Sequence, residues 1–111
     1  MTAVTDEYMK QMLAKSRTYC LVILRDGPNR NRSDAKQVVW EHGRRNFQLR
    51  QDGLLSIVCP VTDNSDVAGI GIFNTSLEKT KKIMDNDVGV KEGLFTYEVH
   101  PCRSFPGDCL P

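Results

Sequence analysis

The residues of this chain that could do acid–base chemistry are a histidine inside one helical pattern and an aspartate just after another. His42 lies in a stretch whose apolar residues recur at helical spacing, and Asn46 follows one turn later on the same side. The second pattern ends in MDNDVGVKEG (residues 84–93), which contains Asp85 and Asp87. An imidazole beside a carboxylate can take up and return a proton near neutral pH, so the pair would suit a general base or acid.

The two aspartates stand where negative charge is mildly unfavourable. The C-terminal end of a helix carries partial negative charge, and an anion there costs a few tenths of a kcal/mol or more. Asp87 is the better partner for His42 because it lies in the turn beyond the helix, whereas Asp85 is expected in the last turn and solvated. Desolvation and the helix pole should raise the pKa of Asp87, and an adjacent imidazolium should lower it again. Two simpler interpretations stay open: His42 as a core histidine bonded to a backbone carbonyl, and DND as a plain polar turn.

Positive charge is concentrated around this possible site. Residues 25–50 contain seven cations and three anions, a local +4 in a chain of net charge +1. We expect Arg30 and Arg32, in the loop after the first strand, to help bind a small anionic ligand. The alternative is an ordinary solvated surface.

Composition restricts the classes of protein that the chain can belong to. With 111 residues, 40% hydrophobic and 26% charged, it predicts one globular domain. The near-zero net charge argues against a nucleic-acid partner, and the lack of a long apolar run or signal peptide argues against a membrane partner and favours a cytoplasmic location. We expect no metal site, because His100 and Cys102 make only two ligands. The four cysteines form no CxxC pair and are expected to be reduced: Cys20, Cys59, Cys102 and Cys109.

The pattern of apolar and turn-forming residues predicts three helices and four strands. The inward arc of the central helix should consist of Ala35, Val38, Val39, His42, Asn46 and Leu49, and Gly53 should end that helix. Thr75 and Glu78 have the spacing of a capping box that would begin the third helix. The predicted ranges are helix 5–16, strand 19–24, helix 34–52, strand 54–60, strand 68–74, helix 75–85 and strand 94–101, followed by an irregular tail 102–111.

The order of these elements predicts an α+β fold. After the N-terminal helix it is βαββαβ, which fits a ferredoxin-like sandwich with a four-stranded antiparallel sheet and two helices on one face. The other face should be apolar, so we expect a homodimer through the sheet face. The predicted organisation is a helical extension at 1–17, the ferredoxin-like domain at 18–103 and a tail at 104–111.

Over residues 19–101 the chain resembles the YCII-related family of the dimeric α/β barrel superfamily. The resemblance rests on YCLVILRDGP, His42, DGLLSIVCPV and NDVGVKEGLFTYEVHP. It implies a ferredoxin-like protomer, a sheet-to-sheet dimer and an active-site pair at His42 and Asp87. The chain departs from the family pattern after the aspartate, where Val88 and Gly89 replace a proline and an aromatic residue. Relatives on this fold include cofactor-independent isomerases, dehydrochlorinases and oxygenases, so the fold does not select the reaction.

The leading functional prediction is a small enzyme without metal or organic cofactor that acts on a small polar or anionic metabolite. His42 would be the general base or acid, Asp87 would orient it, and Asn46, Arg30 and Arg32 would contact the ligand. The reaction would be of isomerase, lyase or dehydrochlorinase type. The main alternative is a non-catalytic ligand-binding or regulatory homodimer, and a third is a subunit whose N-terminal helix docks on another protein.

Overall fold

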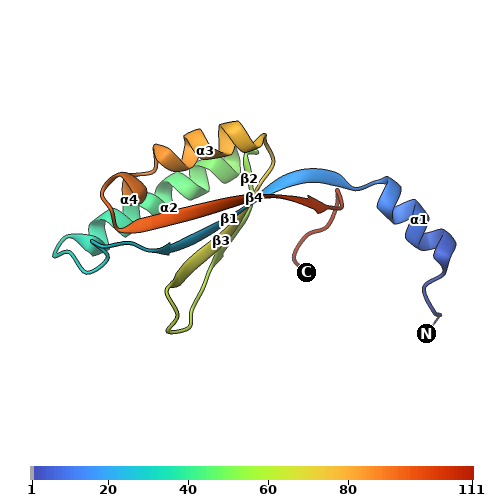
Figure 1. Cartoon of the computed structure of the whole chain (residues 1–111), viewed down its shortest axis with the longest axis horizontal. Helices are drawn as coiled ribbons and strands as arrows, with labels where there is room; N and C mark the ends of the chain where they lie inside the picture. The colour runs from blue at the N-terminus through green and yellow to red at the C-terminus, as the bar shows by residue number, and fades with distance from the viewer. Residues whose placement is uncertain (1) are drawn as a thin grey trace.

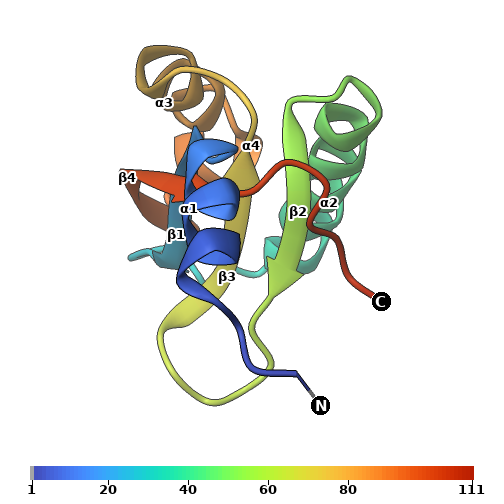
Figure 2. The same ribbon diagram turned by 90° about the vertical axis from the view of Figure 1, so that its right-hand side faces the viewer.

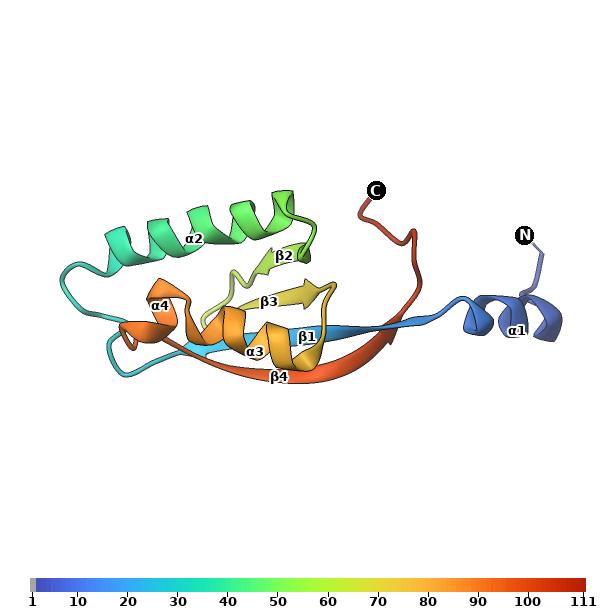
Figure 3. The same ribbon diagram turned by 90° about the horizontal axis from the view of Figure 1, so that it is seen from above.

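The computed structural model describes residues 2–111 and has the predicted α+β architecture. The strands form one antiparallel sheet in the order β2-β3-β1-β4. The longer core helices lie on one face of it, α2 beside β2 and α3 beside β4 (Figures 2 and 3). This is the topology of a ferredoxin-like sandwich, as predicted. The elements are α1 (Asp6–Ala14), β1 (Arg17–Asp26), α2 (Ala35–Gln51), β2 (Leu55–Pro60), β3 (Val67–Phe73), α3 (Leu77–Asp85), α4 (Val88–Lys91) and β4 (Phe95–Ser104).

The core lies between the sheet and the helices. Cys20, Val22 and Leu24 of β1 are buried, whereas the residues that alternate with them are only partly covered. This alternation follows from the period of a strand, whose successive side chains point to opposite faces. The remaining buried core residues are Ala35, Val38, Leu49, Leu55, Phe73, Ile83, Met84, Leu94 and Phe95.

Helix α2 presents the predicted arc to the sheet. Ala35, Val38, His42 and Leu49 are its buried residues. The helix ends before Gly53, whose φ of 77° is the left-handed conformation expected of a residue that terminates a helix. His42 therefore enters the core region from the middle of a rigid seventeen-residue helix.

The predicted start of α3 is wrong by one residue. Ser76 caps the helix, with its hydroxyl accepting from the Lys79 backbone N–H at 3.1 Å. The carbonyl of Thr75 instead accepts a weak bond from the Cys20 thiol at 3.5 Å, which ties Thr75 to the end of the sheet. Both residues are of a type that caps helices, but only Thr75 has a glutamate three residues later, so the capping-box spacing indicated the wrong one of the two.

The predicted irregular tail begins too early. β4 continues through Pro101 to Ser104, and Arg17 pairs with Ser104 where β1 begins. Pro101 is tolerated because β4 is an edge strand. On the side of an edge strand that has no neighbour, a missing backbone N–H removes no hydrogen bond between strands. β1 and β4 consequently extend beyond β3, whose pairing with β1 starts only at Cys20.

No helix covers the other face of the sheet within residues 2–111 (Figure 1). The face is apolar on three strands, as predicted, but polar on β4, where His100 Nε2 lies 2.9 Å from a Glu98 carboxylate oxygen. Ile70 remains 37% exposed there. Cross-strand pairs on this face are Leu21 with Ile72, Ile23 with Ile70, Leu21 with His100, and Ile23 with Glu98. Among the described residues, no helix is both long and apolar enough to cross a membrane.

Candidate active site

Asp87 is the N-cap of a short helix that the sequence pattern did not reveal. Its Oδ2 accepts from the backbone N–H groups of Gly89 at 3.0 Å and Val90 at 3.2 Å. Helix α4 has only four residues, too few for a helical period to be visible. The negative charge of Asp87 therefore stands at the N-terminal end of a helix, where it is favourable, as well as beyond the end of α3.

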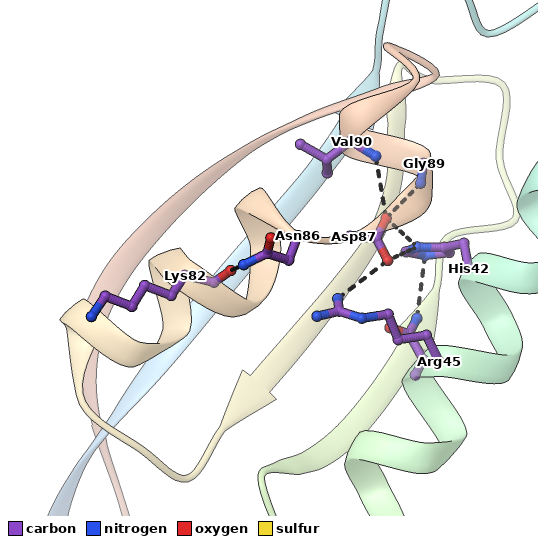
Figure 4. Close-up of polar contacts among 8 residues, drawn as sticks. His42, Arg45, Lys82, Asn86, Asp87, Gly89 and Val90 are labelled. Carbon is purple, nitrogen blue, oxygen red and sulfur yellow. Dashed lines mark hydrogen bonds and ion pairs between the residues drawn. The ribbon is translucent and has the colours of Figure 1, made fainter.

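The structure brings His42 and Asp87 together between α2 and α4. Nδ1 of His42 lies 2.8 Å from Asp87 Oδ2 and 2.9 Å from Oδ1 (Figure 4). His42 is 8% exposed and Asp87 is 1% exposed. The two side chains are close together, as expected, and the hydrogen bond links residues 45 positions apart in the chain.

The protonation of this pair follows from the environment of the carboxyl group. Burial has the largest single influence and raises the pKa of Asp87, but the His42 hydrogen bond and charge, the Val90 N–H and the charge of Arg45 together lower it below its ordinary value of 3.8. Asp87 is therefore a carboxylate at neutral pH and can only accept hydrogen bonds. Nδ1 of His42 must donate to it, which leaves Nε2 as the unprotonated nitrogen of the neutral ring.

Asn46 occupies the free side of the imidazole. Its Nδ2 lies 3.2 Å from His42 Nε2, one helical turn further along α2. With Nδ1 protonated, the amide N–H of Asn46 donates to Nε2. Asn46 was predicted to contact a ligand; the structure places it at Nε2 of His42 and in the lining of the hollow that also includes His42.

Arg45 is a member of the cluster that the sequence analysis missed. Its Nη1 lies 3.6 Å from Asp87 Oδ1 (Figure 4), although the predicted inward arc of α2 did not include it. The side chain is 30% exposed, so the guanidinium reaches inward along the helix surface. Its spacing of three residues from His42 was the available signal, because residues i and i+3 lie on neighbouring parts of a helix.

Phe95 supplies an aromatic wall beside the imidazole. The two ring centroids are 5.0 Å apart, and Phe95 is 4% exposed. A Cβ atom on Gly89 would lie 2.6 Å from Phe95 Cδ2, so the ring of Phe95 fills the space that a side chain at position 89 would need. The aromatic residue expected after the aspartate in the family pattern is absent here, and a ring from β4 lies against that position instead.

The two arginines predicted to bind an anion lie in different places. Arg30 has its guanidinium carbon 5.7 Å from the Phe95 ring centre and its Nε 3.5 Å from Asp26 Oδ1. Arg32 instead pairs with Asp34 at 2.6 Å and Glu92 at 3.6 Å. Arg30 thus stands at the site, whereas Arg32 fastens the loop after β1 to the end of α4.

A hollow of about 980 Å³ runs along α2, the edge strand β2 and β3, and reaches residues 104–110 near the C-terminus. Its lining includes His42, Asn46, Arg30 and Phe95, and does not include Asp87 or Arg32. Asp87 lies behind the imidazole, so a molecule in the hollow would meet His42 first. Within residues 2–111, no group of three or more histidine, cysteine, aspartate or glutamate side chains is arranged to hold a metal ion.

Two glycine substitutions should have opposite effects on stability. We expect Gly89→Ala to lower the free energy of unfolding by about 1–3 kcal/mol, because the new Cβ would displace Phe95 and would lie 3.1 Å from Asp87 Oδ2. Gly43→Ala is the matched control: a Cβ there meets nothing within 4 Å, and alanine is favoured over glycine in a helix by about 1 kcal/mol. Urea unfolding of both variants measures the difference, and equal effects would contradict the described packing of Gly89.

Acid should remove the stabilisation that Asp87 provides. Because its pKa is lower in the folded chain than its ordinary value of 3.8, ionised Asp87 stabilises the fold above that value, and the contribution is lost as the pH falls through the lowered pKa. The gap in unfolding free energy between the wild type and Asp87→Asn should therefore be full at pH 6 and shrink below about pH 4. Urea titrations of both proteins across this range test the prediction, and a gap that widens in acid would contradict it.

The fold and the site together define a class: a ferredoxin-like α+β protein with a buried His–Asp pair beside an open hollow.

No family model matches the chain, and no curated protein matches it. Among solved structures it is similar to 5-chloro-2-hydroxyhydroquinone dehydrochlorinase (TftG) from Burkholderia phenoliruptrix AC1100, in a complex with 2,5-dihydroxybenzoquinone. The identity is 20%, the TM-score is 0.51, and the match covers 74% of this chain and 90% of that chain. TftG has the dimeric α/β barrel fold, and at this identity the likeness supports the fold alone, so membership of the YCII-related family stays a prediction.

Proposed function

We propose that this chain is a small homodimeric enzyme that moves one proton of a bound metabolite without a metal ion or organic cofactor. The observation that carries the proposal is the buried carboxylate of Asp87 bonded to Nδ1 of His42, a residue that lines the hollow, whereas Asp87 does not line it. A carboxylate in this position fixes the tautomer and ring orientation that a histidine base needs.

In the proposed mechanism, Nε2 of His42 accepts a proton from a C–H or O–H group of the ligand. The imidazolium that forms is balanced by Asp87, whose carboxylate keeps its bond to Nδ1–H. In an isomerisation, Nε2 returns the proton to another atom of the same molecule. In an elimination, the electron pair of the broken C–H bond forms a new π bond while the leaving group departs with its own pair, as chloride does in a dehydrochlorination.

The amide of Asn46 must move away from Nε2 of His42 during such a reaction. Its amide N–H occupies Nε2 at 3.2 Å, so the ligand must displace it before a proton can move. Once Nε2 is protonated it becomes a donor, and rotation of the Asn46 amide would then offer its oxygen as the acceptor. Asn46 is thus suited to hold the imidazole in place in both protonation states.

The walls of the site indicate the chemical class of the ligand. Arg30 and the ring of Phe95 together favour a flat molecule that carries a carboxylate or an ionised hydroxyl group. A small hydroxylated ring of the kind bound by TftG would present an acidic O–H to His42 and a planar face to Phe95. We propose small hydroxylated rings as the ligand class of this chain as well.

A non-catalytic ligand-binding or regulatory homodimer is the second candidate function. It is favoured by one observation: every polar atom of the His42 ring already has a partner, with Asp87 on Nδ1 and Asn46 on Nε2. Such a ring would be satisfied as a structural element without any substrate.

The test that separates the two functions starts from a thermal-shift screen against small hydroxylated aromatic compounds and carboxylic acids. Compounds that raise the melting temperature are then incubated with the protein in D₂O, and the loss of ligand proton signals is followed by NMR. An enzyme of the proposed type should catalyse exchange or turnover of at least one bound compound. Binding without exchange or turnover in every case would favour the non-catalytic function.

The two arginines should differ in their effect on ligand binding. Arg30→Ala should weaken the binding of carboxylate-bearing compounds by roughly tenfold, the effect of losing about 1.5 kcal/mol of charge-assisted hydrogen bonding. Arg32→Ala removes the same charge from outside the hollow and serves as the matched control. Calorimetric titration of both variants measures the effect, and equal losses of affinity would mean that only the general positive potential matters.

A further inference from the structure

Arg45 places a permanent positive charge beside the carboxylate that holds His42. Its Nη1 lies 3.6 Å from Asp87 Oδ1, and Figure 4 shows Arg45 and His42 reaching the same carboxyl group from α2. A guanidinium stays charged in proteins, whereas an imidazolium exists only when the ring has taken up a second proton. Arg45 is therefore a fixed countercharge of Asp87.

Asp87 does not depend on Arg45 for its hydrogen bonds. Its Oδ2 accepts from the backbone N–H groups of Gly89 and Val90, and Nδ1 of His42 lies 2.8 Å from the same oxygen. The contact of 3.6 Å to Arg45 is longer than a hydrogen bond. Arg45 therefore acts on the His42–Asp87 pair through its charge.

The charges of the three side chains balance only while the ring is neutral. Asp87 is 1% exposed and His42 is 8% exposed, so water and salt screen the charges between them weakly. With a neutral imidazole, the carboxylate and the guanidinium sum to zero. A second proton on His42 would leave a net positive charge in this buried place, and a nearby like charge disfavours the charged form of an ionisable group. Asp87 thus favours protonation of His42, and Arg45 opposes it.

The other charged residues around the imidazole are differently placed. Arg30 Nε lies 3.5 Å from Asp26 Oδ1, so these two charges largely cancel. Asp85 at the end of α3 is exposed and accepts from a tyrosine hydroxyl at 2.6 Å, and the ring that β4 places beside His42 is uncharged. The remaining charged residues in the lining of the hollow are Arg50 in the last turn of α2, Asp63 between β2 and β3, and Asp108 near the C-terminus.

We infer that Arg45 is a positioning residue that acts through Asp87 to keep the imidazole of His42 unprotonated in the ligand-free protein. The value of this role for catalysis rests on the proposed function, because a general base must be unprotonated before it can take a proton. When the ligand gives its proton to Nε2, the ligand keeps the electron pair. The negative charge that develops on the ligand then offsets the positive charge added to the ring.

NMR titration of the ligand-free protein tests the inference, with His42→Gln to identify the ring signals of His42. In Arg45→Met, which keeps a long apolar side chain, the ring should bind its proton roughly three- to tenfold more tightly than in the wild type, so its titration midpoint should move to higher pH. The effect is smaller than that of a fully buried charge because the Arg45 side chain is 30% exposed. Arg45→Lys keeps a positive charge and should stay close to the wild type.

Arg44→Met is the matched control. It removes the same charge one position away on α2, from a side chain that is 67% exposed and pairs with Glu41 at 3.1 Å. Its titration midpoint should stay near that of the wild type, because an exposed and paired charge is well screened. Circular dichroism verifies that each variant is folded, and Arg45→Gln is a second variant in which the same shift is expected.

A higher midpoint in Arg45→Met and Arg45→Gln than in Arg44→Met supports the inference. An unchanged midpoint in the two Arg45 variants would overturn it. So would equal shifts in Arg45→Met and Arg44→Met, because the net charge of the chain would then explain both. The titration needs no ligand, so the inference can fail while the proposed enzyme stands, and it can hold even if no compound undergoes exchange.

Discussion

His42→Gln is expected to reduce proton exchange on a bound ligand by about 10²–10⁴-fold, the usual contribution of a positioned general base. Glutamine can still donate a hydrogen bond to Asp87, so the buried carboxylate keeps a partner, but an amide cannot take up a proton near neutral pH. Exchange in D₂O followed by NMR, with any compound that the thermal-shift screen identifies, measures the effect.

The control for this prediction is binding, measured by calorimetry on the same variant. If His42 acts in catalysis, ligand affinity should change far less than the exchange rate, because Arg30 and Phe95 remain in place. An unchanged exchange rate in His42→Gln would exclude His42 as the base. A parallel fall in affinity and stability, with no exchange in the wild type, would instead favour the structural or regulatory role.

Asp87→Ala should lower the free energy of unfolding by about 3–5 kcal/mol, because each buried donor that loses its acceptor costs about 1–3 kcal/mol. The substitution would leave the imidazole Nδ1–H and the backbone N–H groups of Gly89 and Val90 without their acceptor. Urea unfolding followed by circular dichroism is the measurement.

Asp85→Ala is the matched control two residues away. Asp85 is exposed and accepts from the Tyr97 hydroxyl at 2.6 Å, and burial together with this carboxylate raises the pKa of Tyr97 to about 12. Loss of such a surface bond should cost less than about 1 kcal/mol. Similar losses for the two aspartates would contradict the different environments described here.

Periodicity explains why the position of His42 could be predicted. A seventeen-residue helix has enough turns for its buried stripe to be visible, and His42 lies in the middle of that stripe. Asp87 could be chosen over Asp85 because a residue beyond the last turn of a helix is free to point sideways. Apolar runs bounded by turn-forming residues likewise predicted the strands, and the order of the helices and strands predicted the fold.

The rest of the site depends on contacts that have no period in the sequence. Phe95 lies in the strand predicted over 94–101, but its contact with His42 results from the way β4 and α2 pack. Arg45 lies outside the predicted inward arc, and its guanidinium still reaches Asp87 because a long side chain can cross from one side of a helix to another. Arg30 and Arg32 could not be told apart, since irregular loops do not reveal from sequence which side chain points inward.

The central claim is that Asp87 holds the His42 proton on Nδ1 and leaves Nε2 available at the wall of the hollow. Long-range ¹⁵N–¹H NMR of the imidazoles tests this most directly, because the chain has only two histidines and His42→Gln identifies the signals of His42. The neutral ring should show a protonated Nδ1 and an unprotonated Nε2, and Asp87→Ala should abolish that preference. A neutral His42 that carries its proton on Nε2 in the wild type would contradict the account.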